Sequence, residues 1–275
     1  MEFVKMEASG NDFVLINGFK YDIQDYSQMA RELCHRRYGV GADGILVCRD
    51  SNIADIKMIY YNSDGSMGEM CGNGIRSFSK FVYEEKLIEN KFFTVETGSG
   101  IKNIDLEIES GLVKTIKVNM GKAIFDPRHI PINMDKDKVI EEEIFLDGKL
   151  IVFSSIRVGV PHSVIFINDI NEIDVNDLGR KIEIHPLFPN NTNVNFIEIN
   201  SPDSINIYTW ERGAGRTLGC GTGACASVVI GNFLGKLSNR VEVRTEGGQL
   251  EVILGDDSGI YMVGGARKTF KGHFL

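Results

Sequence analysis

The sequence predicts an α+β fold of two pseudo-symmetric domains, each a mostly antiparallel sheet wrapped around one central helix. A short cysteine motif occurs twice, as Cys71-Gly72-Asn73-Gly74 and as Cys220-Gly221-Thr222-Gly223. An apolar run of helical character follows each motif, and further segments repeat at nearly the same separation of 149 residues. Short runs of β-forming residues, bounded by turn residues, surround both motifs. Together these observations indicate a duplicated unit of strands around a helix.

In the first half, periodicity and turn residues define the elements. A helix is expected over 27–37, with Arg36 and Arg37 near its C-terminal end, where cations complement the helix dipole. The first central helix should run over 75–83, after its cysteine motif. Strands are expected where β-forming residues end in turn residues, at 13–17, 45–48, 56–61, 92–96, 101–108 and 112–118.

The second half repeats this order. A shift of 149 residues takes Cys71 to Cys220 and Asn62 to Glu211, and strand 164–168 corresponds to strand 13–17. The second central helix should cover 224–234, which is apolar on all sides, as a helix surrounded by strands must be. We therefore expect a pseudo-twofold relation that brings the two helix N-termini to a common interface, where ligand sites are frequent.

The expected domains are residues 1–120 and 121–265. Residues 122–149 match nothing in the first half and are interpreted as the connection with an added strand region. The C-terminal segment 266–275 is expected to pack back onto the first domain.

Composition excludes several classes of function. A net charge of −8 argues against a nucleic-acid partner or an anionic membrane surface, because both require a basic footprint. No stretch approaches the roughly 18 apolar residues of a membrane span, and the N-terminus lacks a signal-peptide pattern, so a cytoplasmic protein is expected. Five cysteines without a C-x-x-C pair give no support for a metal site.

Two cysteines at helix N-termini suggest acid–base chemistry. The unpaired N–H groups and partial positive charge of a helix start favour a thiolate and can also hold an anion. If Cys71 and Cys220 face one another, one can remove a proton from a carbon while the other delivers a proton to the opposite face. Backbone N–H groups at 72–73 and 221–222 could hold an α-carboxylate and stabilise the carbanion. This scheme implies neither a metal nor pyridoxal phosphate.

Three other interpretations of the motifs fit the sequence less well. A nucleotide-binding loop at 213–223 lacks both a following Gly-Lys-Ser/Thr and a parallel βαβ unit. A thiol hydrolase or transferase would use one cysteine with a base such as His162, which leaves the second motif without a role. A module that binds an amino acid without chemistry would not need both thiols.

At these residues the sequence resembles the diaminopimelate epimerase family, pyridoxal-phosphate-independent enzymes of lysine and peptidoglycan precursor synthesis. The resemblance implies a two-domain fold, an amino-acid substrate held between the halves, no cofactor, and usually a homodimer. It covers nearly the whole chain, in blocks at 8–13, 41–44, 62–66, 71–76, 159–162, 193–196 and 211–223.

The resemblance also implies roles for individual residues. Cys71 and Cys220 correspond to the two acid–base thiols, and His162 and Glu211 to residues that tune the pKa of a thiol. In residue chemistry, Arg212 can bind a carboxylate with two hydrogen bonds and Glu211 can accept from an ammonium. The residues that correspond to substrate contacts are Asn11, Asn62, Gly72, Asn73, Asn193, Glu211, Arg212, Gly221 and Thr222.

Two positions depart from the family pattern. Val160 stands where the family usually has asparagine, and Gly44 stands where many members have glutamine. Proline racemase-like relatives characteristically have histidine where this chain has Asn73. The expected reaction is inversion of LL-2,6-diaminoheptanedioate to the meso form. The alternatives are a racemase of another amino acid, such as histidine, and a non-catalytic amino-acid-binding module.

Overall fold

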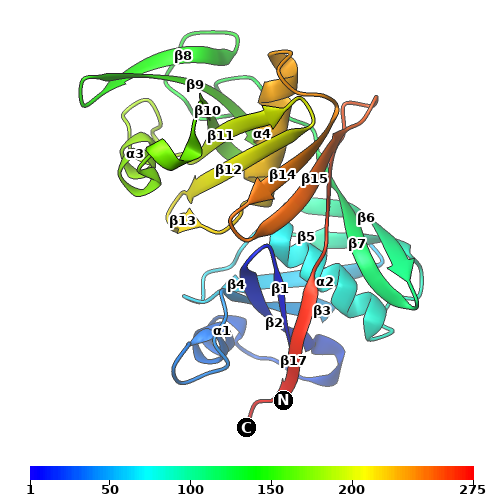
Figure 1. Ribbon diagram of the computed structural model, residues 1–275. Helices are drawn as coiled ribbons and strands as arrows, with labels where there is room; N and C mark the ends of the chain where they lie inside the picture. Colours follow the sequence, from blue (N-terminus) through cyan, green and yellow to red (C-terminus); the bar gives the residue numbers. More distant parts are fainter. The chain divides into compact units, whose positions relative to one another are not determined.

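The computed structural model describes residues 1–275, which form two compact units (Figure 1). The first unit comprises residues 1–119 together with 263–275, and the second comprises residues 120–262. Each unit is a mostly antiparallel sheet with one long buried helix, as the sequence predicts. No helix is both long enough and apolar enough to cross a membrane.

In the first unit the strands pair in the order β17-β1-β2-β3-β4-β5-β6-β7. Only the β2–β3 and β4–β5 pairs are parallel. The strands are β1 (Glu2–Ala8), β2 (Asn11–Asn17), β3 (Gly44–Arg49), β4 (Ile56–Asn62), β5 (Phe92–Thr97), β6 (Gly100–Glu109), β7 (Leu112–Gly121) and β17 (Arg267–His273). The helices are the 3₁₀ turn η1 (Gly18–Lys20), α1 (Tyr26–Cys34) and α2 (Gly72–Glu84).

The central helix of this unit, α2, is buried from its first residue to Val82 but is not apolar on every side. Arg76 is fully buried and donates hydrogen bonds to the carbonyl oxygens of Gly72 and Gly265. Lys80 lies 2.7 Å from the carboxylate of Glu84. These cations are tolerated because Arg76 is hydrogen-bonded and Lys80 is ion-paired, which offsets the cost of removing a charge from water.

The structure corrects the prediction for the first helix. Helix α1 ends at Cys34, so Arg36 and Arg37 lie beyond it and do not complement its dipole. Arg36 instead donates to both carboxylate oxygens of Asp12, at 3.1 and 2.9 Å, and lies 2.7 Å from Asp43. The prediction was wrong because Arg36 forms ion pairs with Asp12 and Asp43, which a local helical pattern does not reveal.

In the second unit the strands pair in the order β8-β9-β10-β11-β12-β14-β15, and only β10–β11 and β12–β14 are parallel. The strands are β8 (Val139–Leu146), β9 (Lys149–Val158), β10 (Val160–Ile167), β11 (Asn193–Ser201), β12 (Ser204–Glu211), β13 (Gly215–Thr217), β14 (Arg240–Thr245), β15 (Gly248–Leu254) and β16 (Ile260–Gly264), of which the last two residues belong to the first unit. The helices are the 3₁₀ turn η2 (Ile170–Glu172), α3 (Val175–Glu183) and α4 (Gly221–Phe233).

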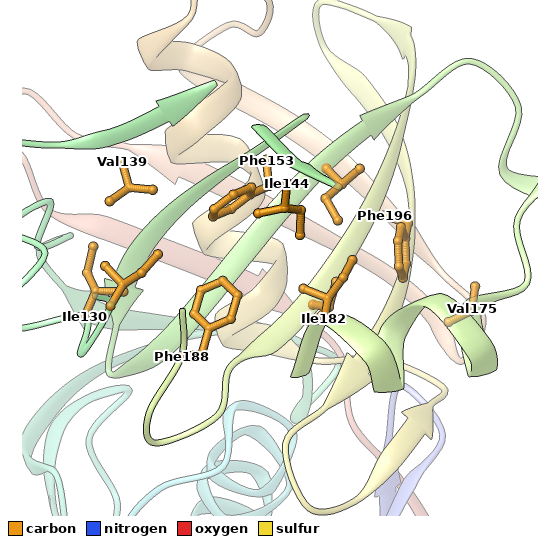
Figure 2. Close-up of a cluster of buried hydrophobic side chains, with 11 residues drawn as sticks. Ile130, Val139, Ile144, Phe153, Val175, Ile182, Phe188 and Phe196 are labelled. Atoms are coloured by element: carbon orange, nitrogen blue, oxygen red, sulfur yellow. The ribbon is translucent and has the colours of Figure 1, made fainter. Parts of the chain in front are cut away.

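The second unit packs an apolar cluster between helix α3 and the sheet (Figure 2). Val175 and Ile182 of α3, together with Phe153 and Phe196 of the sheet, are at most 1% exposed. Burial of each such side chain contributes roughly 1.5–3 kcal/mol to the stability of the folded unit. This cluster fixes strands β10, β11 and β12, which carry many of the candidate site residues of this unit.

The repeat found in the sequence extends to the element boundaries. Helices α2 and α4 each have 13 residues, and α1 and α3 each have 9. Phe13 is paired with Gly44 in the β2–β3 register, and His162 is paired with Asn193 in the β10–β11 register. Helix α3 and the β8–β9 hairpin are elements that the sequence analysis did not define.

Candidate active site

Both motif cysteines are the N-cap residues of the long buried helices, as predicted. Cys71 and Cys220 have extended backbones, with φ of −136° and −112°. The Sγ atom of Cys71 accepts a hydrogen bond from the N–H of Gly74, and that of Cys220 accepts from Gly223, each at 3.4 Å. A capping side chain satisfies one of the N–H groups that a helix start leaves unpaired. Each thiol is therefore held at the positive end of a helix dipole.

In the first unit, Cys71 lies beside Asn11. The Cys71 thiol donates to Asn11 Oδ1 at 3.6 Å, and the Asn11 amide nitrogen donates to Asp43. Asp43 thus orients Asn11 with its oxygen toward the thiol. Burial alone would raise the pKa of the adjoining Asp12, but hydrogen bonds from Arg36 and Lys5 outweigh burial and lower this pKa to about 2.

The other candidates of the first unit lie on α2 and at the end of β4. Gly72 and Asn73 form the first turn of α2, where the Asn73 side-chain oxygen accepts from Arg76 at 3.0 Å. Asn62 ends β4, where it accepts a hydrogen bond from the Tyr60 hydroxyl and donates to Ser66 at 2.9 Å. Internal contacts thus fix both side chains.

In the second unit, burial and a neighbouring carboxylate favour the thiol form of Cys220. Burial, followed by the negative charge of Glu211, raises the pKa of the Cys220 thiol well above its usual value. Burial also raises the pKa of Glu211, whose carboxylate accepts from Thr217 at 2.6 Å and is hydrogen-bonded to the thiol. The Thr222 hydroxyl lies 3.3 Å from Sγ. At Cys220 the helix terminus therefore does not produce a thiolate by itself, contrary to expectation, because burial outweighs the N–H contact.

His162 is fully buried on β10. Burial, with a smaller contribution from the nearby charge of Arg212, lowers the pKa of the imidazole to about 3. Its Nδ1 atom lies 3.2 Å from the amide nitrogen of Asn195, and its Nε2 atom has no hydrogen-bond partner within the protein. His162 is therefore neutral across the physiological pH range.

Asn193 and Arg212 lie next to each other in space, and each side chain hydrogen-bonds to backbone atoms. Asn193 Oδ1 accepts from the N–H of Arg212 at 2.9 Å, and its amide nitrogen donates to Pro161 O at 2.8 Å. The exposed guanidinium of Arg212 donates to Asn190 O at 2.9 Å. Asn193 thereby fixes the start of the loop that carries Arg212.

Three residues of these sites were missed as functional candidates. Asp43, Asn195 and Thr217 all lie inside the sequence blocks that carry the resemblance, but none of them was predicted as a site residue. For Asn195 a signal existed, because the 149-residue shift places it opposite the apolar Leu46. A polar residue that replaces an apolar one in a repeat marks a position where the two halves differ in chemistry.

The chemistry available is proton transfer by two thiols, of which Cys220 is buried and Cys71 is half-buried beside the Asn11–Asp43 hydrogen bond. The acid–base groups are two thiols, one carboxyl and a neutral imidazole. No group of three or more histidine, cysteine, aspartate or glutamate side chains is placed to hold a metal ion.

Comparison of the sequence with known proteins identifies the family to which it is similar. The sequence profile of diaminopimelate epimerase matches residues 3–125 and 154–269. Diaminopimelate epimerase of Alkaliphilus metalliredigens strain QYMF is 44% identical over 276 residues, which cover 100% of this chain and 98% of that relative. Diaminopimelate epimerase of Clostridium perfringens strain 13 is also 44% identical over 276 residues, which cover 100% of both chains.

Solved structures with low sequence identity share the fold. A probable proline racemase from Agrobacterium radiobacter K84 superposes with a TM-score of 0.73 at 14% identity, covering 100% of this chain and 92% of that chain. A hydroxyproline epimerase from Agrobacterium vitis superposes with a TM-score of 0.72 at 14% identity, covering 99% and 91%. Given the family profile and the full-length relatives, this chain belongs to the diaminopimelate epimerase family.

Proposed function

We propose that this chain epimerises LL-2,6-diaminoheptanedioate to the meso form, with Cys71 and Cys220 as the two acid–base groups. The observation that carries the mechanism is the matched pair of capping thiols, 149 residues apart at the N-termini of helices of equal length. Membership in the diaminopimelate epimerase family supports the substrate.

The reaction breaks one C–H bond and forms another on the opposite face of the same carbon. One cysteine, as thiolate, takes the α-proton and becomes a thiol, while the other, as thiol, gives its proton to the carbanion and becomes a thiolate. The raised pKa of Cys220 supports Cys220 as the thiol that begins the cycle. Cys71 is then the base for the isomer whose α-proton it faces.

The carbanion must be stabilised, because the α-proton of an amino acid is only weakly acidic. We assign this task to the backbone N–H groups of Gly72, Asn73, Gly221 and Thr222, which lie in the first turns of α2 and α4. We further assign Arg212 to a substrate carboxylate, and Glu211 with Asn11, Asn62 and Asn193 to the remaining polar groups. We assign His162 and Glu211 to tuning the pKa of the thiols, and Glu211 acts on Cys220.

We also propose that the active form is a cytoplasmic homodimer, as in the family. The domains proposed from the sequence, 1–120 with 266–275 and 121–265, would each provide one thiol. Sedimentation equilibrium of the purified chain measures the oligomeric state directly.

The decisive experiment follows the α-proton in deuterium oxide. We expect the wild-type enzyme to exchange the α-proton of diaminopimelate and to interconvert its isomers. Cys71→Ser and Cys220→Ser should fold as well as wild type, because serine is a good helix N-cap, yet should lose epimerisation by at least about 10²-fold. Cys34→Ala removes a buried thiol without a proposed role, so it serves as the control and should epimerise normally.

Two outcomes would contradict the proposal. Exchange with another amino acid, such as histidine, and none with diaminopimelate would exclude the substrate. Full epimerisation by either serine variant would exclude the two-thiol mechanism.

A further inference from the structure

The helix starts that carry the two capping cysteines lie against different sets of three strand residues, each set here called a trio. In the first unit Phe13, Leu46 and Tyr60 lie on β2, β3 and β4, and the Phe13 and Tyr60 rings pack edge to face with centroids 6.1 Å apart. In the second unit the corresponding positions are His162, Asn195 and Thr209, on β10, β11 and β12. His162, Asn195 and Thr209 are at most 2% exposed. Burying polar side chains costs free energy unless they are hydrogen-bonded, so this polar trio calls for a functional explanation.

The strand registers establish that the positions correspond. Leu46 is paired with Tyr60 between β3 and β4, and Asn195 is paired with Thr209 between β11 and β12. Each trio also contacts the helix start in the same way. A Cβ atom added to Gly74 would lie 3.5 Å from Leu46 Cδ1 and 3.3 Å from Cys71 Cβ.

In the second unit, the amide oxygen of Asn195 takes the position that the Leu46 Cδ1 methyl group has in the first unit. A Cβ atom added to Gly223 would overlap Asn195 Oδ1 and would lie 3.3 Å from Cys220 Cβ. Asn195 therefore contacts the first turn of α4 directly beside the Cys220 side chain.

The hydrogen bonds of Asn195 determine how its amide is oriented. Its Nδ2 atom lies 3.2 Å from the carbonyl oxygen of Ser163, which can only accept, so this end of the side chain is the NH₂ group. The same Nδ2 lies 3.2 Å from His162 Nδ1. Its Oδ1 atom accepts from the Thr209 hydroxyl at 3.2 Å.

The tautomer of His162 follows from this orientation. Since an NH₂ group can only donate, Nδ1 of the imidazole must be the acceptor, and a neutral ring then carries its proton on Nε2. That Nε2 atom is buried and has no hydrogen-bond partner within the protein. The ring is neutral because burial strongly disfavours its charged form.

We propose that Asn195 is a positioning residue that holds His162 in the Nε2–H tautomer, so that the imidazole offers the site a hydrogen-bond donor and not a base. This inference rests on the proposed function, because it assigns what His162 contributes during epimerisation. A neutral N–H donor stabilises negative charge, such as that of a thiolate or a substrate carboxylate, without taking a proton. It also argues against a cysteine–histidine hydrolase, in which the imidazole must accept the thiol proton.

The first test is the tautomer itself. Long-range ¹H–¹⁵N correlation spectra of the ¹⁵N-labelled full-length chain should show His162 with a protonated Nε2 and an unprotonated Nδ1 near neutral pH. The His162→Phe spectrum assigns the signal. A protonated Nδ1 in the wild-type chain would overturn the inference whatever the enzyme activity, whereas absence of epimerase activity with the expected tautomer would overturn only the proposed function.

The second test changes the tautomer with little change of volume. In Asn195→Asp the carboxylate can only accept from Nδ1, so the ring proton moves to Nδ1 or the ring becomes an imidazolium. We expect kcat to fall by about tenfold or more with a smaller change in KM, together with a shifted pH profile. Asn200→Asp makes the same change at the exposed end of the same strand and should retain wild-type kinetics.

The third test uses a triple variant to separate packing from function. His162→Phe/Asn195→Leu/Thr209→Val removes the three polar groups together and leaves an apolar trio resembling that of the first unit. A folded but inactive variant supports the inference. A folded variant with wild-type kcat, or an Asn195→Asp variant with an unchanged pH profile, would show that the trio only fills space.

Discussion

At the scale of single residues, burial determines which groups of the second unit carry charge. His162, Glu211 and Cys220 are each shifted toward their neutral forms, and burial is the largest cause in each case. In the first unit, Asp12 stays ionised despite burial, because Arg36 and Lys5 donate hydrogen bonds to it. Burial thus favours uncharged side chains in the second unit, while the first unit uses fixed charges to orient Asn11 beside Cys71.

A pH dependence of stability follows from His162. The folded-state pKa is about 3 and the unfolded value is near 6.5, so the unfolded chain binds a proton between these values and the folded chain does not. The free energy of unfolding should therefore decrease as pH falls below about 6.5, with a contribution from His162 of about 2 kcal/mol by pH 5. Urea titrations between pH 7 and 5 measure this slope.

Two variants isolate the contribution of this histidine. His162→Phe should reduce the slope, because the unfolded chain then lacks the group that binds the proton. His129→Gln removes an imidazole that is 62% exposed, so it should change the slope less than His162→Phe does. An undiminished slope in His162→Phe would assign the effect to other groups.

At the scale of elements, α2 and α4 have the same length and the same type of N-cap but rest on different surfaces. The first turn of α2 faces the methyl group of Leu46 and the ring of Phe13, each 3.5 Å from the place that a Cβ atom on Gly74 would take. The first turn of α4 contacts the amide of Asn195, which three hydrogen bonds hold in place. Local sequence makes the two helix starts alike, and the strands beneath them make them chemically different.

This difference predicts unequal effects of the same substitution. Gly74→Ala adds a methyl group at ordinary contact distance from Leu46 and Phe13, so the free energy of unfolding should change by no more than about 1 kcal/mol. Gly223→Ala forces the Asn195 amide away from its partners and should cost about 2 kcal/mol or more. Thermal unfolding of both variants measures the contrast, and equal losses would show that the Asn195 amide is free to move.

At the scale of the whole molecule, the two ends of the chain lie in one unit. Strand β17 pairs antiparallel with β1, and the N-terminal amine donates to Phe274 O at 2.5 Å. Phe3 of β1 packs edge to face with Phe270 of β17, with ring centroids 6.0 Å apart. The first unit is therefore completed by the last residues of the chain, after the second unit has been traversed.

A truncation tests this arrangement. Removal of residues 266–275 deletes β17 and exposes one edge of β1, so amide hydrogen exchange should accelerate in β1 and β2 while β11 and β12 remain protected. Removal of Leu275 alone, which is fully exposed, should leave exchange at its wild-type rate. Uniform acceleration in both units would mean that the two units unfold together.

Much of the fold is predictable from local signals. The two cysteine caps, the helices after them and most strands of the first half depend on glycine, turn residues and apolar periodicity within short windows. The predicted first helix ends three residues beyond the end of α1, because the role of Arg36 is set by Asp12 of β2 and by Asp43 in the loop before β3.

The sequence by itself determined the duplication, the two thiols at helix N-termini and the family, because these depend on residue types at fixed spacing. Only the tertiary structure decided that His162 is buried and neutral and that Asn195 holds its Nδ1 atom. That arrangement requires β10, β11 and β12 to lie side by side, with Asn195 of the middle strand facing residues from both neighbours. Hydrogen-bond direction and burial are properties of neighbours in space, which spacing along the chain does not specify.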